Sequence, residues 1–376
     1  MTAGIPVAVN LLWCRPGQVG GSEEYLVRQL LGLEELAAAG QQPFAVTAYA
    51  AAGFTAAHPE IGPSVALVEG PRWAIRRPAR VAAEHTWLAG RTRGASLVHH
   101  GGGTAPSVGR RPIVLTLHDL QFLTYPQYVH PVKLRYLRGT VSSSVRRAAV
   151  IAVPSEYVRG SVIDAYGTDP ASVVVVPHGI EPPSTADGVA PLARAAVVRA
   201  RYGLGDQPYL VLPAITHPHK GHRLILDVLA RTADLRLVLL GGRGAADADV
   251  ESAIGALRLS ARVVRPGRVP DADRDAIVAG AEALVFPSEY EGFGAPVLEA
   301  MALGTPVICS DRTSLPEVAG DAALVTPLDV DAWLAALDAL AARRTELIAA
   351  GIARAAMFST RHSAEALVAA YRLALP

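Results

Sequence analysis

A glycine-rich turn separates a strand from a helix in Val285-Phe-Pro-Ser-Glu-Tyr-Glu-Gly-Phe-Gly-Ala-Pro-Val-Leu-Glu-Ala-Met-Ala302. The largely apolar run at residues 282–286 predicts a buried strand. Gly292 and Gly294 allow a tight turn with close approach of the backbone to a ligand. Pro296 suits the first helical position, because its missing N–H would have no partner there in any case. A strand, a turn and a helix in this order are the unit of a doubly wound α/β sheet.

The same unit recurs along the chain, because short runs rich in Val, Ile and Leu alternate with longer helical patterns. We expect strands at residues 6–13, 43–49, 64–68, 96–99, 112–117, 150–153, 172–176, 209–213, 235–240, 261–264, 282–286, 305–308 and 322–325. We expect helices at residues 22–40, 78–91, 131–148, 155–166, 191–202, 219–232, 247–258, 271–280, 296–303, 329–355 and 359–375. The sequence therefore predicts two doubly wound, Rossmann-like α/β domains that face each other across a cleft.

Length and composition bound the class of protein. A chain of 376 residues is longer than a domain with a single hydrophobic core usually is, which favours two domains. The composition, with 51% apolar and 18% charged residues, indicates a folded protein. A Pro-, Ser- and Gly-containing stretch at 181–205 predicts the boundary between domains 1–185 and 186–358. We expect no membrane-spanning helix and no secretory signal. Cys14 and Cys309 are too few and too far apart for a disulfide framework. We expect both to be buried in the protein core, and we expect the protein to be in the reducing cytoplasm.

Charge is distributed unevenly along the chain. Residues 1–150 carry 15 Arg and Lys against 8 Asp and Glu, a net +7, and the remainder carries 20 against 26, a net −6. This asymmetry predicts an anionic partner for the first half, and we expect no nucleic acid. Residues 72–93 combine arginines with Trp73 and Trp87, which fits either a solvated helix face with two packed tryptophans or peripheral contact with anionic lipid at the inner membrane face.

Four segments that follow strands carry the candidate chemistry. In the first, the amides of Val297 and Leu298 would lie free at a helix N-terminus and suit a phosphate, while Glu291 and Glu299 would accept hydrogen bonds from hydroxyl groups. The alternative is an ordinary helix start with acidic residues favoured by its dipole.

The second segment is Pro213-Ala-Ile-Thr-His-Pro-His-Lys-Gly-His222. Lys220 would neutralise a pyrophosphate. The three histidines could instead indicate a metal site, but no carboxylate or cysteine lies close in the sequence.

The third segment ends the strand at 112–117 with His118 and Asp119, and His118 is either a structural hydrogen-bonding residue or a cleft residue. Gly20 and Gly21, after the first strand, form either a tight strand–helix turn or a loop whose amides contact a ligand. Ser22 is the expected N-cap of the helix that follows.

Residues 287–308 resemble the Glu–seven residues–Glu motif of retaining glycosyltransferases of family 4, which have the GT-B fold. The match includes Gly304, Pro306 and Val307, and Leu315-Pro316-Glu317 continues it. The resemblance implies an acceptor-binding first domain, a second domain that binds a nucleotide-diphosphate sugar, and a last helix within 359–376 that crosses back to the first domain.

The resemblance also implies roles for single residues. Glu291 would contact the donor sugar and Glu299 the ribose, with Lys220 on the diphosphate. Backbone at Phe293, Gly294, Val297 and Leu298 would meet sugar and phosphate. Val269 would contact the base through its backbone, and His118 would face the transferred sugar. Gly20, Gly21 and His219 complete the expected donor site.

The chain departs from the family pattern at Ala214, where a second cation is usual. His219, His222 or Arg243 would then compensate. Asp247-Ala-Asp249 and Asp271-Ala-Asp273 match the Asp-x-Asp motif of metal-dependent transferases. Both segments lie where helices are expected to begin, however, and acidic residues are favoured there by the helix dipole. The sequence therefore predicts transfer without a metal or other cofactor.

The expected function is transfer of a mannose-like or glucose-like hexose to a carbohydrate or lipid-linked acceptor, with retention of configuration. Guanosine-diphosphate mannose and uridine-diphosphate hexoses both fit as donors. Two alternatives are a nucleotide-sugar epimerase or hydrolase on the same fold, and a catalytically silent sugar-nucleotide-binding partner protein.

Overall fold

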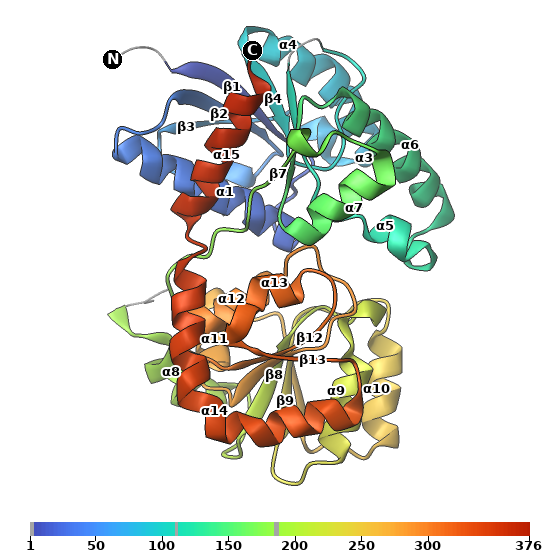
Figure 1. Ribbon diagram of the computed structural model, residues 1–376, viewed down its shortest axis with the longest axis vertical. Coiled ribbons are helices and arrows are strands. Elements are labelled where there is room, and N and C mark those ends of the chain that lie inside the picture. The colour runs from blue at the N-terminus through green and yellow to red at the C-terminus, as the bar shows by residue number, and fades with distance from the viewer. Residues whose placement is uncertain (1–3, 110–111, 184–187) are drawn as a thin grey trace. The chain divides into compact units, whose positions relative to one another are not determined.

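The computed structural model describes residues 4–109, 112–183 and 188–376. It divides into two compact units, shown in Figure 1. Unit 1 comprises the chain up to Gly179 together with Phe358–Pro376, and unit 2 comprises Ile180–Met357. The expected domain boundary between 185 and 186 lies outside the described residues, and the expected cleft between the domains stays a prediction.

Unit 1 is built on a seven-stranded parallel sheet in the order β3-β2-β1-β4-β5-β6-β7. Its strands are β1 (Ile5–Leu11), β2 (Phe44–Ala50), β3 (Val65–Glu69), β4 (Leu97–His100), β5 (Ile113–Thr116), β6 (Val150–Val153) and β7 (Val173–Val175). Its helices are α1 (Gly21–Ala38), α2 (Phe54–Ala57), α3 (Arg77–Ala83), α4 (Ala89–Arg91), α5 (Gln121–Thr124), α6 (Pro131–Arg147), α7 (Glu156–Tyr166) and α15 (Thr360–Ala374).

Unit 2 is built on a six-stranded parallel sheet in the order β10-β9-β8-β11-β12-β13. Its strands are β8 (Tyr209–Pro213), β9 (Arg236–Leu240), β10 (Val263–Gly267), β11 (Ala283–Phe286), β12 (Val307–Ser310) and β13 (Leu324–Thr326). Its helices are α8 (Pro191–Arg201), α9 (His222–Ala230), α10 (Asp247–Ala256), α11 (Asp271–Ala279), α12 (Ala295–Ala302), α13 (Leu315–Ala319) and α14 (Val330–Ala356). The two doubly wound, Rossmann-like sheets confirm the expected fold class.

Most expected elements differ from the structure in their bounds by a few residues, and for two of them the difference has a clear local cause. The strand expected at 261–264 runs as β10 through Pro266 to Gly267, because β10 is an edge strand and an edge tolerates proline. The single helix expected at 78–91 is interrupted by the π turn η2 (Glu84–Leu88). The side chains of His85 and Thr86 donate to carbonyls one turn earlier at 2.8 Å each, which competes with regular helical bonding.

The last helix belongs to unit 1, as the resemblance implies. α15 packs along α1, as Figure 1 shows. Gly32 of α1 makes this close approach possible, because a Cβ there would lie 2.1 Å from the carbonyl oxygen of Thr360. Tyr371 of α15 is fully buried, and its hydroxyl lies 2.9 Å from Nδ1 of His99 in β4. The C-terminal helix is therefore part of the core of unit 1.

Gly32→Ala tests this packing. Alanine favours a helix over glycine, yet we expect the variant to be destabilised by about 1–3 kcal/mol, because the added methyl group collides with backbone. Urea unfolding measures the change. The matched control is Gly139→Ala in α6, where nothing lies near the added methyl group and stability should be equal or higher by about 0.5–1 kcal/mol. Equal effects of the two substitutions would contradict the packing.

Candidate functional site

Two loops meet at the carboxyl edge of the sheet in unit 2. β8 and β11 are neighbouring parallel strands, so the segments that follow them leave the sheet side by side. The amide of Glu289 donates to the carbonyl of His219 over 2.8 Å. Gly221 has a positive φ of 68°, and a Cβ there would lie 2.1 Å from the carbonyl oxygen of Pro287. Only glycine fits this contact, which fixes the two loops against each other.

Lys220 and Glu291 form an ion pair across the two loops. Lys220 Nζ lies 2.6 Å from Glu291 Oε1, and both side chains are largely buried. The backbone of Glu291 is also held, because its amide donates to Thr313 Oγ1 at 3.0 Å and its carbonyl accepts from Ser314 Oγ at 3.0 Å. The pair is therefore a positioned cation and a positioned carboxylate at one point of the sheet edge.

The start of α12 differs from the expectation in detail. The helix begins at Ala295, so that Pro296 takes its second position. The sequence predicted a free amide at Val297, and this is wrong, because that amide donates to the carbonyl of Gly294 at 3.0 Å. The amides that precede the first helical hydrogen bond, those of Gly294 and Ala295, are the donors this helix end can offer to an anion.

The glycine-rich turn is held from the following loop. Gly294 has a positive φ of 96°, which suits glycine. Phe293 is buried, and its carbonyl accepts from Ser314 Oγ at 2.9 Å. Leu298 is buried in α12. Ser314 and Thr313 therefore shape the turn, although sequence reasoning assigned them no role.

Glu299 lies one turn further along α12, in a charged environment. Its negative charge acts on Arg274 and Asp275 of α11. Burial raises the pKa of Asp275, and the nearby carboxylate of Glu299 raises it further. Glu299 and Glu291 therefore have different charged neighbours, and their separate roles stay a prediction.

A cavity of about 270 Å³ lies at the carboxyl ends of β8, β9 and β10. Its lining residues are Ala214, Thr216, Leu239, Gly241, Arg243, Glu251, Arg265 and Gly267. Val269 follows Gly267 by two residues and is partly buried. The cavity thus lies beside the segment for which the resemblance implies contact with a base.

The histidines of the 213–222 segment do not replace the missing cation at neutral pH. Burial, the largest cause, with the charge of Lys220 lowers the pKa of His219 to about 3. Burial likewise lowers the pKa of His222 to about 4. Both rings are therefore uncharged near pH 7. Of the three expected substitutes Arg243 remains, with a side chain that is 85% exposed and 3.7 Å from Asp247.

The two Asp-x-Asp segments begin helices, as expected. Asp247 accepts from Arg265 and from Thr216 Oγ1. Asp273 accepts from Arg201 at 2.7 Å and from the Tyr202 hydroxyl at 2.6 Å. Within residues 4–109, 112–183 and 188–376, no group of three or more His, Cys, Asp or Glu is arranged to hold a metal ion.

The expected residues of the first domain lie in unit 1. His118 Nε2 donates to the carbonyl of Gly101 at 2.8 Å, and its ring packs against Tyr25 at 5.2 Å and Trp13 at 5.9 Å. Burial lowers the pKa of His118. His118 is thus anchored as a structural residue at a strand end, and its contact with a sugar stays a prediction.

The loop before α1 also differs from the expectation. The helix begins at Gly21, and Gly20, with a φ of 69°, is its N-cap in place of Ser22. The carboxylate of Glu23 accepts from the amide of Gly17 at 2.9 Å and lies 3.0 Å from His58 Nε2. Glu23 therefore shapes the glycine-rich loop, a role that its place in the first helical turn did not indicate.

Comparison with known proteins identifies the family of the chain. Residues 19–183 match the family described as Glycosyltransferase Family 4, and residues 198–354 match Glycosyl transferases group 1. O-antigen chain mannosyltransferase B of Escherichia coli is 34% identical over 273 residues, covering 69% of this chain and 70% of that protein. D-inositol 3-phosphate glycosyltransferase of Segniliparus rotundus is 28% identical over 286 residues, covering 70% of this chain and 61%, less than two thirds, of that protein.

Among solved structures, Anabaena HepE in complex with UDP and glucose aligns with a TM-score of 0.76 at 18% identity, covering 98% of this chain and 99% of that one. This likeness identifies the two-sheet architecture as the GT-B fold. The chain belongs to the group 1 glycosyltransferases, and its relatives include mannosyltransferases.

The buried histidines of unit 2 predict a pH dependence of stability. A histidine whose pKa is lowered on folding is protonated more readily in the unfolded chain. The stability of the protein is therefore unaffected by this group above about pH 6.5, and it falls as the pH drops from there toward the pKa of the histidine in the folded protein. Between pH 6 and pH 4, His222→Gln should reduce the slope by about 1.4 kcal/mol per pH unit.

Urea unfolding at a series of pH values measures this slope, followed by the fluorescence of Trp333, the one tryptophan in the sequence of unit 2. His217→Gln is the control, because its ring is only partly buried and should change the slope less. An unchanged slope in His222→Gln would contradict the claim that the His222 ring is buried and uncharged in the folded protein.

Proposed function

We propose that the protein transfers a hexose from a nucleotide-diphosphate sugar to an acceptor hydroxyl, and that unit 2 holds the donor. The observation that supports this most is the ion pair between Lys220 and Glu291 beside the start of α12. A positioned lysine suits the diphosphate, and a positioned carboxylate suits sugar hydroxyls. The names of the mannosyltransferase relatives favour mannose as the sugar.

In this proposal the leaving diphosphate is stabilised electrostatically. Lys220 and the amides at the start of α12 would oppose the negative charge that develops when the glycosidic bond to phosphate breaks. Glu291 would orient the sugar and Glu299 the ribose. Retention of configuration rests on the resemblance of residues 287–308 to retaining enzymes.

Transfer without a metal is part of the same proposal. Asp247 and Asp273 are already engaged by arginine side chains, so they serve the packing of α10 and α11. Lys220 would then supply the positive charge that a metal supplies elsewhere.

We place the acceptor, a carbohydrate or a lipid-linked carbohydrate, in unit 1. A cavity of about 290 Å³ lies at the carboxyl ends of β1, β2 and β3, the usual place for ligands in such sheets. Its lining includes Arg15, Gln18 and Ile75. The cationic side chain of Arg15 at its edge suits an acceptor with an acidic or phosphate group.

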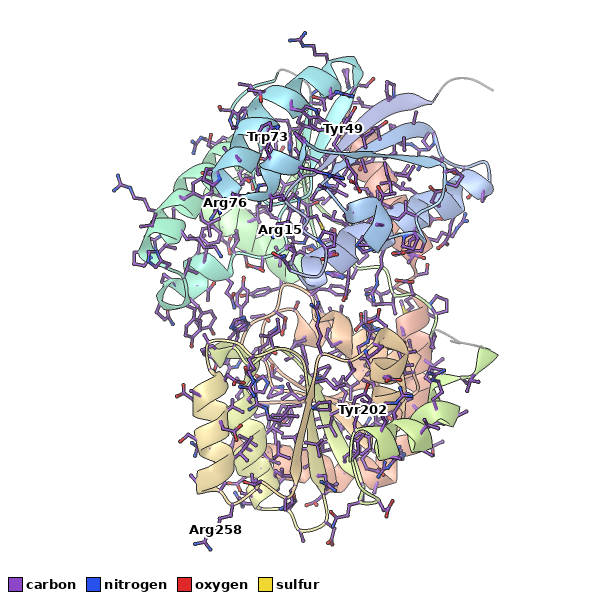
Figure 2. All side chains as sticks on the ribbon, turned by 180° about the vertical axis from the view of Figure 1, so that it is seen from behind. Arg15, Tyr49, Trp73, Arg76, Tyr202 and Arg258 are labelled. Atoms are coloured by element: carbon purple, nitrogen blue, oxygen red, sulfur yellow. The ribbon has the colours of Figure 1, made fainter. Side chains whose placement is uncertain are left out.

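Peripheral contact with an anionic membrane is a further part of the proposal for unit 1. Trp73 is 57% exposed, so the expectation of two packed tryptophans is wrong for this residue. Ile75 is also exposed, and Arg76 follows it. Figure 2 shows Arg15, Trp73 and Arg76 on one face of unit 1. No helix of the described residues is long and apolar enough to span a bilayer.

Co-sedimentation with liposomes tests the membrane contact. We expect binding to vesicles with anionic lipid that falls when Trp73→Ser and Arg76→Ser are combined, because both apolar insertion and charge attraction are removed. Vesicles of neutral lipid are the control. Lack of binding to either kind of vesicle would end this part of the proposal.

Lys220→Met tests the donor site. The affinity for nucleoside diphosphates should fall roughly 10-fold or more, while affinity for the corresponding nucleosides should change little, because the lost charge faces phosphate. Isothermal titration measures both. Lys133→Met, at the one other lysine of the chain, is the matched control and lies in α6 of unit 1. An equal loss for nucleosides would contradict the placement of Lys220 on the diphosphate.

Two rival functions predict other outcomes. An epimerase or hydrolase would convert a nucleotide sugar rapidly and completely without an acceptor. A silent partner protein, suggested by the absent cation at Ala214, would bind a nucleotide sugar and transfer nothing to a broad panel of acceptors. The proposed transferase requires an acceptor for turnover.

A further inference from the structure

The cavity at the ends of β8, β9 and β10 holds a fixed pair of charged side chains. Arg265 Nη1 lies 2.7 Å from Glu251 Oε2, and both residues line the cavity. Arg265 stands where the register between β10 and β9 shifts, between Val264 and Gly267. Such irregularities turn a side chain out of the regular alternation, which here brings an arginine to the cavity wall.

The arginine is itself fixed by its surroundings. Arg265 Nη2 donates to Asp247 Oδ1, and Asp247 also accepts from Thr216 Oγ1 at 3.2 Å. Thr216 Oγ1 in turn accepts from the amide of Gly244 at 2.7 Å. This chain of contacts joins the segments after β8 and β9 to strand β10. Arg265 therefore has a defined place, and it orients the carboxylate of Glu251.

The carboxylate of Glu251 retains acceptor capacity toward a ligand. A carboxylate offers about four lone-pair sites, and Arg265 occupies one of the two oxygens. The Glu251 side chain is 69% exposed, and that of Arg265 is 22% exposed, so the acceptor lies at the rim. Arg243, 85% exposed, stands at the same cavity and can cover a flat ring by cation–π contact.

The bases of nucleotides differ in what they offer to a carboxylate. Guanine presents two adjacent donors, N1–H and the 2-amino group, which match the two oxygens of a carboxylate. Uracil presents one N–H flanked by two carbonyl oxygens, which a carboxylate repels. Adenine presents one amino group beside a ring acceptor. The small residues Ala214, Gly241 and Gly267 in the lining leave room for the larger purine ring.

We propose that this cavity selects guanine as the base of the donor, with Glu251 accepting from N1–H and the 2-amino group and Arg265 positioning that carboxylate. The inference rests on the proposed function, since it assumes that unit 2 binds a nucleotide-diphosphate sugar. It goes beyond that function by naming the base and the residues that read it.

Titration with four nucleoside diphosphates tests the proposal. The wild-type protein should bind GDP tightest, and roughly 10- to 100-fold tighter than UDP or ADP. IDP, which lacks only the 2-amino group, should fall in between. Glu251→Gln should lower the affinity for GDP by roughly 10-fold, because the variant cannot accept from both guanine donors. The affinity for UDP should stay equal or rise, because the variant removes the charge that repels the carbonyl oxygens of uracil.

Two further variants separate reading of the base from folding. Asp249→Asn, at an exposed acidic residue of the same helix and outside the cavity lining, should bind all four nucleotides as the wild type does. Arg265→Lys should retain part of the preference for GDP over IDP, whereas Arg265→Met should lose it.

The outcomes distinguish this proposal from the one on which it rests. Tighter binding of UDP or ADP, or an equal loss for every base in Glu251→Gln, would overturn the assignment of guanine while the donor site stands. No binding of any nucleoside diphosphate to the wild-type protein would overturn both.

Discussion

The proposed donor site depends on the pairing of two parallel strands, β8 and β11. Because they are neighbours, the loops after them leave the same edge of the sheet, and the hydrogen bond from the Glu289 amide to the His219 carbonyl locks them together. Gly221 lets the backbones touch. Lys220 and Glu291 meet only because of this contact. A cation from one loop and a carboxylate from the other thus become one site, at the end of a parallel sheet where ligands usually bind.

The electrostatics of this site rest on very few charges. Burial keeps His219 and His222 uncharged near neutral pH, so Lys220 is the charged side chain of the 213–222 segment. The amides at the start of α12 supplement it through the helix dipole. Arg265 lies nearby, although carboxylates on both sides hold it. In the proposed function, stabilisation of the diphosphate therefore depends on the position of Lys220 and of each backbone amide, because the segment contains no second lysine.

Much of this could be predicted from the sequence, and the exceptions have physical causes. The strand, turn and helix within residues 285–302 could be predicted to within a residue or so, because an apolar run and a glycine-rich turn are strong local patterns in a sequence. The sequence missed Ser314 and Arg265, since both reach the site through tertiary contacts from other loops. The sequence also led to a wrong prediction of which amides of α12 are free. The hydrogen bond from the Val297 amide to the Gly294 carbonyl depends on the residue at which the helix begins, and the sequence does not determine that residue closely enough.

The most direct test of the account is a thermodynamic cycle between Glu299 and the ribose of the donor. Affinities of the wild-type protein and of Glu299→Gln would be measured by isothermal titration for a nucleoside diphosphate and for its 2′,3′-dideoxy analogue. The account predicts that the wild type prefers the ribonucleotide roughly 10-fold and that the variant loses this preference, because the carboxylate accepts from the ribose hydroxyls. An equal preference in both proteins, or no binding at all, would contradict the assignment of residues 289–299 to the donor.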